Sequence, residues 1–255
     1  MATIRGLIAL GLGFLIFALT MLPFCFVMLL LLPWRDIRIR LGNHYARVVA
    51  PILISFTGTN IDIEGKEHLD PNRPAIYVTN HSSNLDPLLA MAICPVGGCG
   101  ISKKQLAFIP FFGQIYWLSG HLLIDRSNRK RAIASMKQVT ETIDKYKLSL
   151  WIWPEGTRSR DGRLLPFKKG FVHLALETKL PIVPIITHDG HKRWPTRSFK
   201  MFPGRLKITV LPPISTQNWN SSKLDQHLHD TKMTFTKTLS AHQHPLPEHM
   251  CIPKA

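Results

Sequence analysis

The sequence has few acidic residues and few cysteines. Sixteen Asp and Glu stand against 32 Lys and Arg, which gives a formal net charge of +16 over 255 residues. An excess of positive charge of this size favours association with a polyanion, either nucleic acid or an anionic bilayer. The four cysteines contain no C-x-x-C pair, which argues against a disulfide framework or a zinc site. We expect reduced thiols, with Cys94 and Cys99 as small buried residues.

Ionisable side chains are absent from a long stretch near the N-terminus. Residues 6–34 are 29 positions without Asp, Glu, Lys, Arg or His, more than the roughly 20 apolar residues that a helix needs to cross the hydrocarbon core. A cleaved signal peptide would have a shorter apolar region and a small-residue cleavage site. The stretch is therefore expected in a membrane, and residues suited to the headgroup level flank it: Arg5, Trp34, Arg35, Arg38 and Arg40.

Pro23 leaves two geometries open for this stretch. It forms either one kinked span or two shorter helices that dip into a single leaflet and return. We favour the second, because the flanking arginines would then share the cytoplasmic side. The expected location is a bacterial inner membrane, with the domain that follows this stretch on its cytoplasmic face. Residues 1–58 would be a membrane-binding helical motif that includes a surface helix over 43–56.

Residues 59–255 alternate between strand and helix patterns. The clearest helix spans 127–147, with Ser127 as a plausible N-cap. Such alternation predicts an α/β fold with a largely parallel mixed sheet flanked by helices. Beyond position 215 the chain is polar and His-rich, which indicates a solvated helix and tail rather than a metal site. Strands are expected near 60–64, 75–80, 98–102, 120–125, 148–153, 181–187 and 205–211.

The segment 75–93 carries a candidate general base. His81 and Asp86 lie between a predicted strand and a predicted helix. An imidazole can take a proton from an alcohol that attacks a carbonyl, while a carboxylate on its other nitrogen fixes the tautomer. The alternative is that Asp86, which precedes Pro87, is an ordinary helix N-cap.

A second strand ends in charged residues, in the sequence WIWPEGTRSR (151–160). If Glu155, Gly156, Thr157 and Arg158 reach the same sheet edge, the arginine can fork onto a phosphate and the glycine turn lets backbone N–H groups approach it. The lysines at 168 and 169 would add positive potential. A solvated surface turn is the alternative, but it leaves the neighbouring EGTR, RSRDGR and FKKG segments unexplained as a group.

Four blocks in this order resemble those of the PlsC-type glycerolipid acyltransferases: NHSSNLD, KKQLAFIPFFGQIYWLSGHLLIDR, WPEGTRSRDGRLLPFKKG and PIVPI. The resemblance covers about residues 60–215. It implies an α/β acyltransferase that moves a fatty acyl group from acyl-CoA or acyl-acyl carrier protein to the free hydroxyl of lysophosphatidate. No metal or bound cofactor is implied. Anionic membrane lipids would be the partners, and nucleic acid would not.

The resemblance also implies site residues. The catalytic pair falls on His81 and Asp86, and Ser82 stands where many lysophosphatidate-specific members have Gln. Two alternatives remain: the same chemistry on glycerol-3-phosphate or another lysolipid, and a non-catalytic basic protein that binds lipid or nucleic acid. The expected substrate-binding residues are Lys103, Lys104, Arg126, Glu155, Gly156, Thr157 and Arg158.

Overall fold

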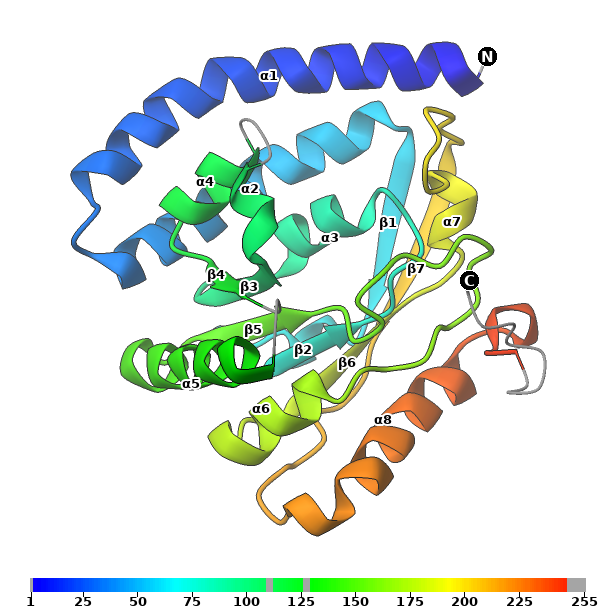
Figure 1. The fold of residues 1–255 in the computed structure, drawn as a ribbon. Coiled ribbons are helices and arrows are strands. Elements are labelled where there is room, and N and C mark those ends of the chain that lie inside the picture. The colour runs from blue at the N-terminus through cyan, green and yellow to red at the C-terminus, as the bar shows by residue number, and fades with distance from the viewer. Residues whose placement is uncertain (1, 109–111, 126–128, 247–255) are drawn as a thin grey trace.

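A seven-stranded mixed sheet forms the centre of the protein (Figure 1). The computed structural model describes residues 2–108, 112–125 and 129–246. The strands are β1 (Thr59–Glu64), β2 (Ile76–Thr79), β3 (Gly98–Lys103), β4 (Leu122–Ile124), β5 (Ser149–Ile152), β6 (Ile182–Thr187) and β7 (Gly204–Val210). Their order is β1-β7-β6-β2-β5-β3-β4, and of these neighbours only β6 and β7 run antiparallel. The predicted strands and the largely parallel mixed sheet are confirmed.

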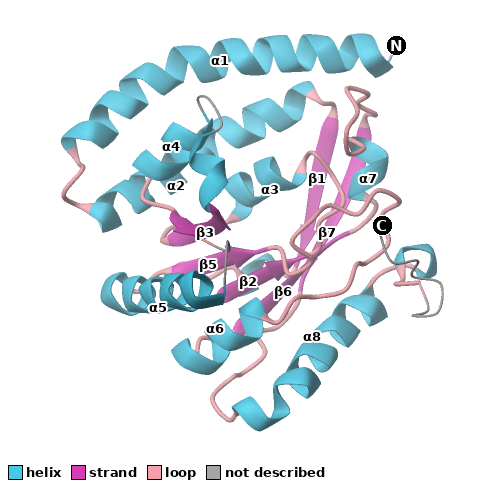
Figure 2. Cartoon of the chain, viewed as in Figure 1, coloured by secondary structure: helices cyan, strands magenta, loops and turns pink. Residues whose placement is uncertain are grey.

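Helices cover both faces of this sheet (Figure 2). They are α1 (Ala2–Leu30), α2 (Arg35–Phe56), α3 (Asp86–Ile93), α4 (Phe112–Leu118), α5 (Arg129–Tyr146), α6 (Gly170–Thr178), α7 (Gly190–Arg193) and α8 (Leu224–Thr238). Strand β2 is buried from both sides, because Ile76 and Val78 join the core cluster formed with α5, α6 and α8, whereas Tyr77 joins the cluster formed with α2 and α3. The expected N-cap Ser127 lies outside the described residues.

The C-terminal helix is less solvated than the polar sequence indicates. Phe235 on α8 is fully buried and packs edge-on against Phe167 at 5.2 Å between ring centroids. Helix α8 is therefore part of the core, although most of its surface is polar. Cys94 and Cys99 are buried free thiols, as expected, and burial raises the pKa of each to about 12.

The N-terminal segment differs from the favoured geometry. Helix α1 runs without a break through Pro23, and the chain reverses at residues 31–34 before α2 begins. Just after the proline, Phe24 stacks on Tyr45 of α2 with 4.2 Å between ring centroids, and Met28 is fully buried. These contacts support the helix beyond the proline, because tertiary packing outweighs the loss of one backbone hydrogen bond. Helix α2 also begins earlier than predicted and continues through Pro51.

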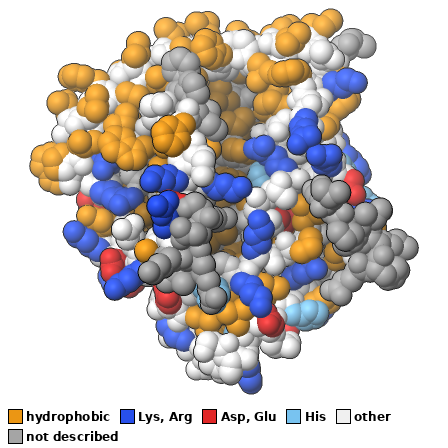
Figure 3. Space-filling model, in the orientation of Figure 1, with side chains coloured by type: hydrophobic (Ala, Val, Ile, Leu, Met, Phe, Trp, Pro, Cys, Tyr) orange, Lys and Arg blue, Asp and Glu red, His pale blue; other side chains and the backbone are white. Residues whose placement is uncertain are grey.

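Helix α1 lies along one side of the molecule and exposes apolar side chains. Only 11% of its most apolar window is buried, and its length and composition suffice to cross a membrane. The space-filling view shows hydrophobic side chains gathered over this side (Figure 3). Two of the expected headgroup arginines turn inward instead: Arg35 donates to the carbonyl of Gly120, and the buried Arg38 donates to the carbonyl of Leu118.

Candidate active site

Two polar loops leave the sheet at the same edge. Strands β2 and β5 are parallel neighbours, with Val78 opposite Ile152. The carboxyl ends of parallel strands meet at one edge, where ligand sites of open α/β sheets gather. Residues 80–86 and 153–158, which follow these two strands, therefore lie next to each other, and the N–H of His81 donates to Glu155.

His81 and Asp86 form a hydrogen-bonded pair. The Nδ1 atom of His81 lies 2.6 Å from Oδ2 of Asp86. A non-helical turn precedes α3 and brings the two side chains together, whereas a continuous helix would hold them roughly 140° apart. The same Asp86 oxygen accepts the backbone N–H groups of Ser82 and Ser83, both at 2.8 Å. A carboxylate at Asp86 would accept a proton from Nδ1 of His81 and leave Nε2 free to accept another.

Trp153 fixes the plane of the imidazole. Its ring stacks on His81 with 4.8 Å between centroids and an interplanar angle of 24°. The Nε1 atom of Trp153 is buried and has no hydrogen-bond partner among the described residues. Sequence reasoning missed this residue, although its place directly before the PEGT turn was a usable signal. The imidazole is thus held by a carboxylate at its edge and an indole at its face.

Glu155 does not lie where a substrate-binding residue is expected. Its side chain is buried, and its two oxygens accept the backbone N–H groups of His81 at 2.6 Å and Leu165 at 3.0 Å. Burial raises the pKa of this carboxyl to about 8, the nearby Asp86 adds to the rise, and the two N–H donors oppose it. The His81 carbonyl in turn accepts the N–H of Ser159 at 2.7 Å. Glu155 therefore ties the two loops together rather than facing a ligand.

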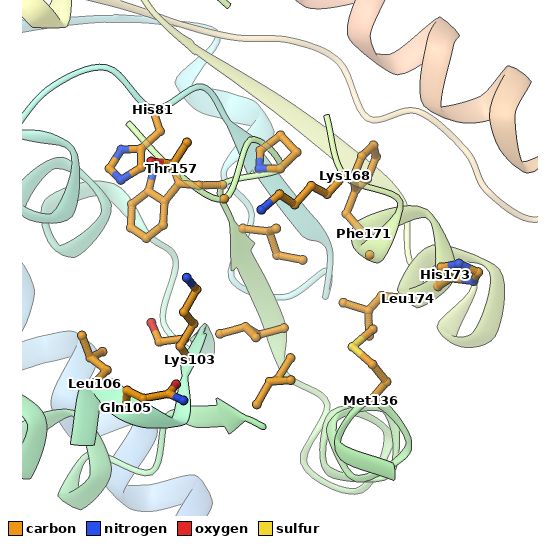
Figure 4. Close-up of a pocket in the computed structure, with 18 of the residues that line it drawn as sticks. His81, Lys103, Gln105, Leu106, Met136, Thr157, Lys168, Phe171, His173 and Leu174 are labelled. Atoms are coloured by element: carbon orange, nitrogen blue, oxygen red, sulfur yellow. The ribbon is translucent and has the colours of Figure 1, made fainter. Parts of the chain in front are cut away.

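Three cationic side chains line the same cavity as His81. Lys103 and Lys168 line this cavity with Gly156 of the glycine turn (Figure 4). Arg158 lines the same cavity. Gly156 has φ of +68°, a conformation that favours glycine, and Lys168 packs over the place where a Cβ would stand. Thr157 also lines this cavity.

The remaining predicted residues fall elsewhere. Lys104 is exposed and does not line the cavity that Lys103 lines. Arg126 lies outside the described residues. Lys169 pairs with Asp225 at 2.7 Å on the surface. The structure thus gathers Lys103, Gly156, Thr157 and Arg158 beside His81, and adds Lys168 to them.

Two cavities meet at His81. The first, of about 970 Å³, holds the cations and continues between β3, β5, α5 and α6 (Figure 4). The second, of about 710 Å³, is largely apolar and extends beneath α1 and α2. His81, Trp153 and Arg158 line both. The site therefore joins a cationic chamber, in which three basic side chains lie among apolar walls, to a second chamber that is more strongly apolar.

The uncharged segment 106–118 contributes side chains to the apolar chamber. Leu106, Ile115 and Tyr116 line this cavity. Phe108 and Trp117 instead point outward, with 78% and 52% of their surfaces exposed. Some of its described residues thus form a cavity wall, and others form an exposed apolar surface.

Comparisons with known proteins agree with the fold and the motif order. The family described as Acyltransferase matches residues 60–188. The 1-acyl-sn-glycerol-3-phosphate acyltransferase of Limnanthes douglasii is 44% identical over 233 residues, which cover 91% of this chain and 82% of that protein. The Escherichia coli (strain K12) protein of the same name is 34% identical over 183 residues, 72% of each chain.

A solved structure shares the fold. The 1-acyl-sn-glycerophosphate acyltransferase PlsC from Thermotoga maritima superposes with a TM-score of 0.76 and 20% identity, covering 93% of this chain and 96% of that one. The matching family and the relatives favour an enzyme over the alternative of a non-catalytic binding protein. The chain belongs to the acyltransferase family, among the PlsC-type glycerolipid acyltransferases.

Proposed function

We propose that this enzyme transfers a fatty acyl group from an acyl thioester to the free hydroxyl of lysophosphatidate and so forms phosphatidate. The observation that carries the proposal is the position of the His81–Asp86 pair where a cationic chamber meets an apolar one. The acceptor has a phosphate and the donor has a long acyl chain, so one chamber suits each. The names of the relatives support the same acceptor.

The cationic chamber would hold the acceptor phosphate. The guanidinium of Arg158 can form two parallel hydrogen bonds to phosphate oxygens, and Lys103 and Lys168 add positive charge. Backbone N–H groups of the glycine turn can also approach a phosphate closely. The acceptor hydroxyl would then lie beside His81, which lines the same chamber.

The apolar chamber would hold the acyl chain of the donor. Its walls come from α1, α2, α3 and the segment 106–118, and its volume of about 710 Å³ lies in the usual range of pockets for small lipidic ligands. An acyl chain that enters from His81 leaves its thioester carbonyl at the imidazole. The carrier portion of the donor would extend toward the open cationic chamber.

The proposed reaction is a direct transfer. Nε2 of His81 takes the proton of the acceptor hydroxyl, and the oxygen attacks the thioester carbon. Asp86 stabilises the imidazolium that forms. When the tetrahedral intermediate collapses, the carbon–sulfur bond breaks, and the leaving thiolate takes the proton from His81. The products are the new ester and a free thiol, and no covalent enzyme intermediate forms.

The donor and the membrane association belong to the same proposal. Either acyl-CoA or acyl-acyl carrier protein would serve as the thioester co-substrate, without a metal or bound cofactor. The exposed apolar side chains of α1 would be embedded in lipid, with residues 1–58 as the membrane-binding motif and the remainder as the catalytic domain. The two relatives named above come from a plant and a bacterium, so we propose a membrane location without naming the membrane.

An acceptor panel tests this function. Purified protein receives a radiolabelled acyl donor with lysophosphatidate, glycerol-3-phosphate or lysophosphatidylcholine, and the labelled products are separated and counted. We expect the fastest turnover with lysophosphatidate. Equal or faster turnover of glycerol-3-phosphate would contradict the acceptor assignment, and the substitution of Ser82 for the Gln common in the family makes this comparison informative.

A further inference from the structure

The segment between β6 and β7 has an unusual composition. Residues 190–203, GHKRWPTRSFKMFP, contain four Lys or Arg and three aromatic residues but no Asp or Glu. We call this segment the basic–aromatic loop. Its exposed residues Arg197, Phe199, Lys200 and Phe202 line neither of the two cavities. The acyl-transfer chemistry therefore does not account for them.

The tip of the loop presents apolar and cationic side chains together. Phe199 is 63% exposed and Phe202 is 39% exposed. Within the described part of the chain, neither Arg197 nor Lys200 has an ion-pair partner, and both are exposed. At the base of the loop, by contrast, Lys192 pairs with Asp189 at 3.1 Å. The free charges and the exposed rings are thus concentrated at the tip.

The tip packs against the beginning of α1. A Cβ atom on Gly6 would stand 1.7 Å from the carbonyl oxygen of Phe199, so only glycine allows this approach. The N–H of Met201 donates to the carbonyl of Ala2 at 3.3 Å. The loop accordingly lies beside the N-terminal end of α1 (Figure 1). The apolar residues exposed on these first turns are Ile4, Leu7 and Ile8.

We propose that the basic–aromatic loop is a second lipid-contact surface, which rests on an anionic bilayer beside the first turns of α1. Cations interleaved with exposed rings suit the interface, because the rings enter the headgroup level while the cations meet anionic lipids. A nucleic acid would also attract the cations, but it would gain nothing from the adjoining apolar turns of α1. The inference rests on the proposed function in one respect, the membrane association of α1.

The loop also connects this surface to residues 81–86, the turn that carries the proposed catalytic pair and is called here the catalytic turn. The carbonyl of Trp194 accepts the N–H of Asn84 at 3.0 Å and the hydroxyl of Ser83 at 2.9 Å. The side-chain amide of Asn84 donates to the carbonyl of Pro195 at 2.9 Å. These bonds reach the residues between His81 and Asp86. Contact of the loop with the bilayer would therefore set the height of the catalytic turn above the lipid.

Site-directed fluorescence quenching tests the proposal on the full chain. Phe199→Cys, Leu15→Cys on α1 and His229→Cys on α8 each carry a bimane label, and the chain without an added cysteine gives the background. Each protein is reconstituted into vesicles of equimolar phosphatidylcholine and phosphatidylglycerol with brominated acyl chains. We expect quenching at positions 199 and 15 but not at 229, because α8 lies on the side opposite α1 (Figure 1).

The outcomes separate this inference from the proposed function. Quenching at 15 without quenching at 199 would overturn the loop contact and leave the membrane association of α1 intact. Quenching at neither position would overturn both. Neither result depends on measured acyl transfer, so the reaction is tested independently by the acceptor panel.

A charge variant tests the anionic character of the contact. The variant Arg197→Gln with Lys200→Gln is made in the labelled Phe199→Cys chain and measured on the same vesicles. Each lost charge should lower the equilibrium constant between the lipid-bound and the water-exposed loop by roughly fivefold, and quenching at position 199 should fall accordingly. The matched control on the α8 side is Lys223→Gln with Lys237→Gln, which should change nothing. Equal quenching in the loop variant and the control would overturn the assignment to anionic lipid.

Discussion

The catalytic turn and the cationic chamber differ in how firmly their side chains are held. At the turn, one Asp86 oxygen has three partners and both Glu155 oxygens accept backbone N–H groups. In the chamber, the side chains of Lys103, Arg158 and Lys168 form no hydrogen bond or ion pair within the described residues. The first region is fixed before any substrate arrives, and the second is free to adapt to an anion.

This difference separates two kinds of contribution. A group held in place by short hydrogen bonds lowers the barrier without reorganisation, so its loss should reduce kcat. A mobile cation that meets the phosphate in both the bound and the transition state contributes mainly to binding, so its loss should raise KM. The predictions below test whether the two regions divide in this way.

The largest effect is expected for His81→Ala. Removing the proton acceptor should lower kcat by about 10²- to 10⁴-fold with little change in KM for lysophosphatidate. Steady-state kinetics with a labelled donor would measure both constants. His229→Ala on the exposed face of α8 is the matched control. A purified His81→Ala protein that keeps the original kcat would eliminate the general-base role.

A somewhat smaller loss is expected for Asp86→Asn. The amide can donate to Nδ1 of His81, which favours the tautomer with its proton on Nε2, the wrong one for a base. We expect kcat to fall by roughly 10²-fold. Thermal unfolding should accompany the kinetics, because Ser82 and Ser83 also donate to this carboxylate. A variant that folds normally and keeps full activity would show that the pair does not need its negative charge.

Arg158→Lys tests the other region. Losing the planar fork while keeping the charge should raise KM for lysophosphatidate by about tenfold and leave kcat nearly unchanged. Arg160→Lys, two residues further on and absent from both cavity linings, is the control. A fall in kcat without a rise in KM would show that Arg158 acts in the transition state, as the residues of the catalytic turn do. The proposed division between the two regions would then be wrong.

A change in stability rather than in the kinetic constants is expected at Glu155. Its pKa in the folded protein is raised from 4.5 to about 8 by burial, so between these pH values the folded protein holds a proton that the unfolded chain has released. The free energy of unfolding should therefore fall as pH rises through this window. Glu155→Gln should flatten the dependence, and thermal unfolding across the window would measure it. The control Glu141→Gln, exposed on α5, should keep the original slope, and an equal slope in Glu155→Gln would contradict the assignment.

Local sequence patterns were sufficient for much of the architecture. The apolar run at 181–187 became β6, which is buried along its whole length. The proximity of His81 to Asp86 was also predictable, because a bend between a strand and a helix can bring an H-x4-D pair together. These features depend on neighbours in the sequence, so a single chain reveals them.

Other features depend on distant contacts and were not predictable. Glu155 turns away from its cationic neighbours, since its two carboxylate oxygens accept the N–H groups of His81 and Leu165. Nothing in the sequence around Glu155 indicates this direction. Likewise, Pro23 predicts a break in the apolar helix, and only the packing of Phe24 on Tyr45 explains why none occurs. The direction of a side chain and the support from another element are products of the complete fold.

Helix α1 limits how far the chain can be shortened. Ala9, Leu10 and Gly13 form part of one wall of the apolar chamber, together with Phe14 and Phe17 further along. Trimming this helix away to improve solubility would open the chamber to water along its length. Under the proposed function, a shortened enzyme should therefore be impaired toward long-chain donors even when its sheet and its imidazole are intact, since the helix that would anchor the molecule would also enclose the acyl chain.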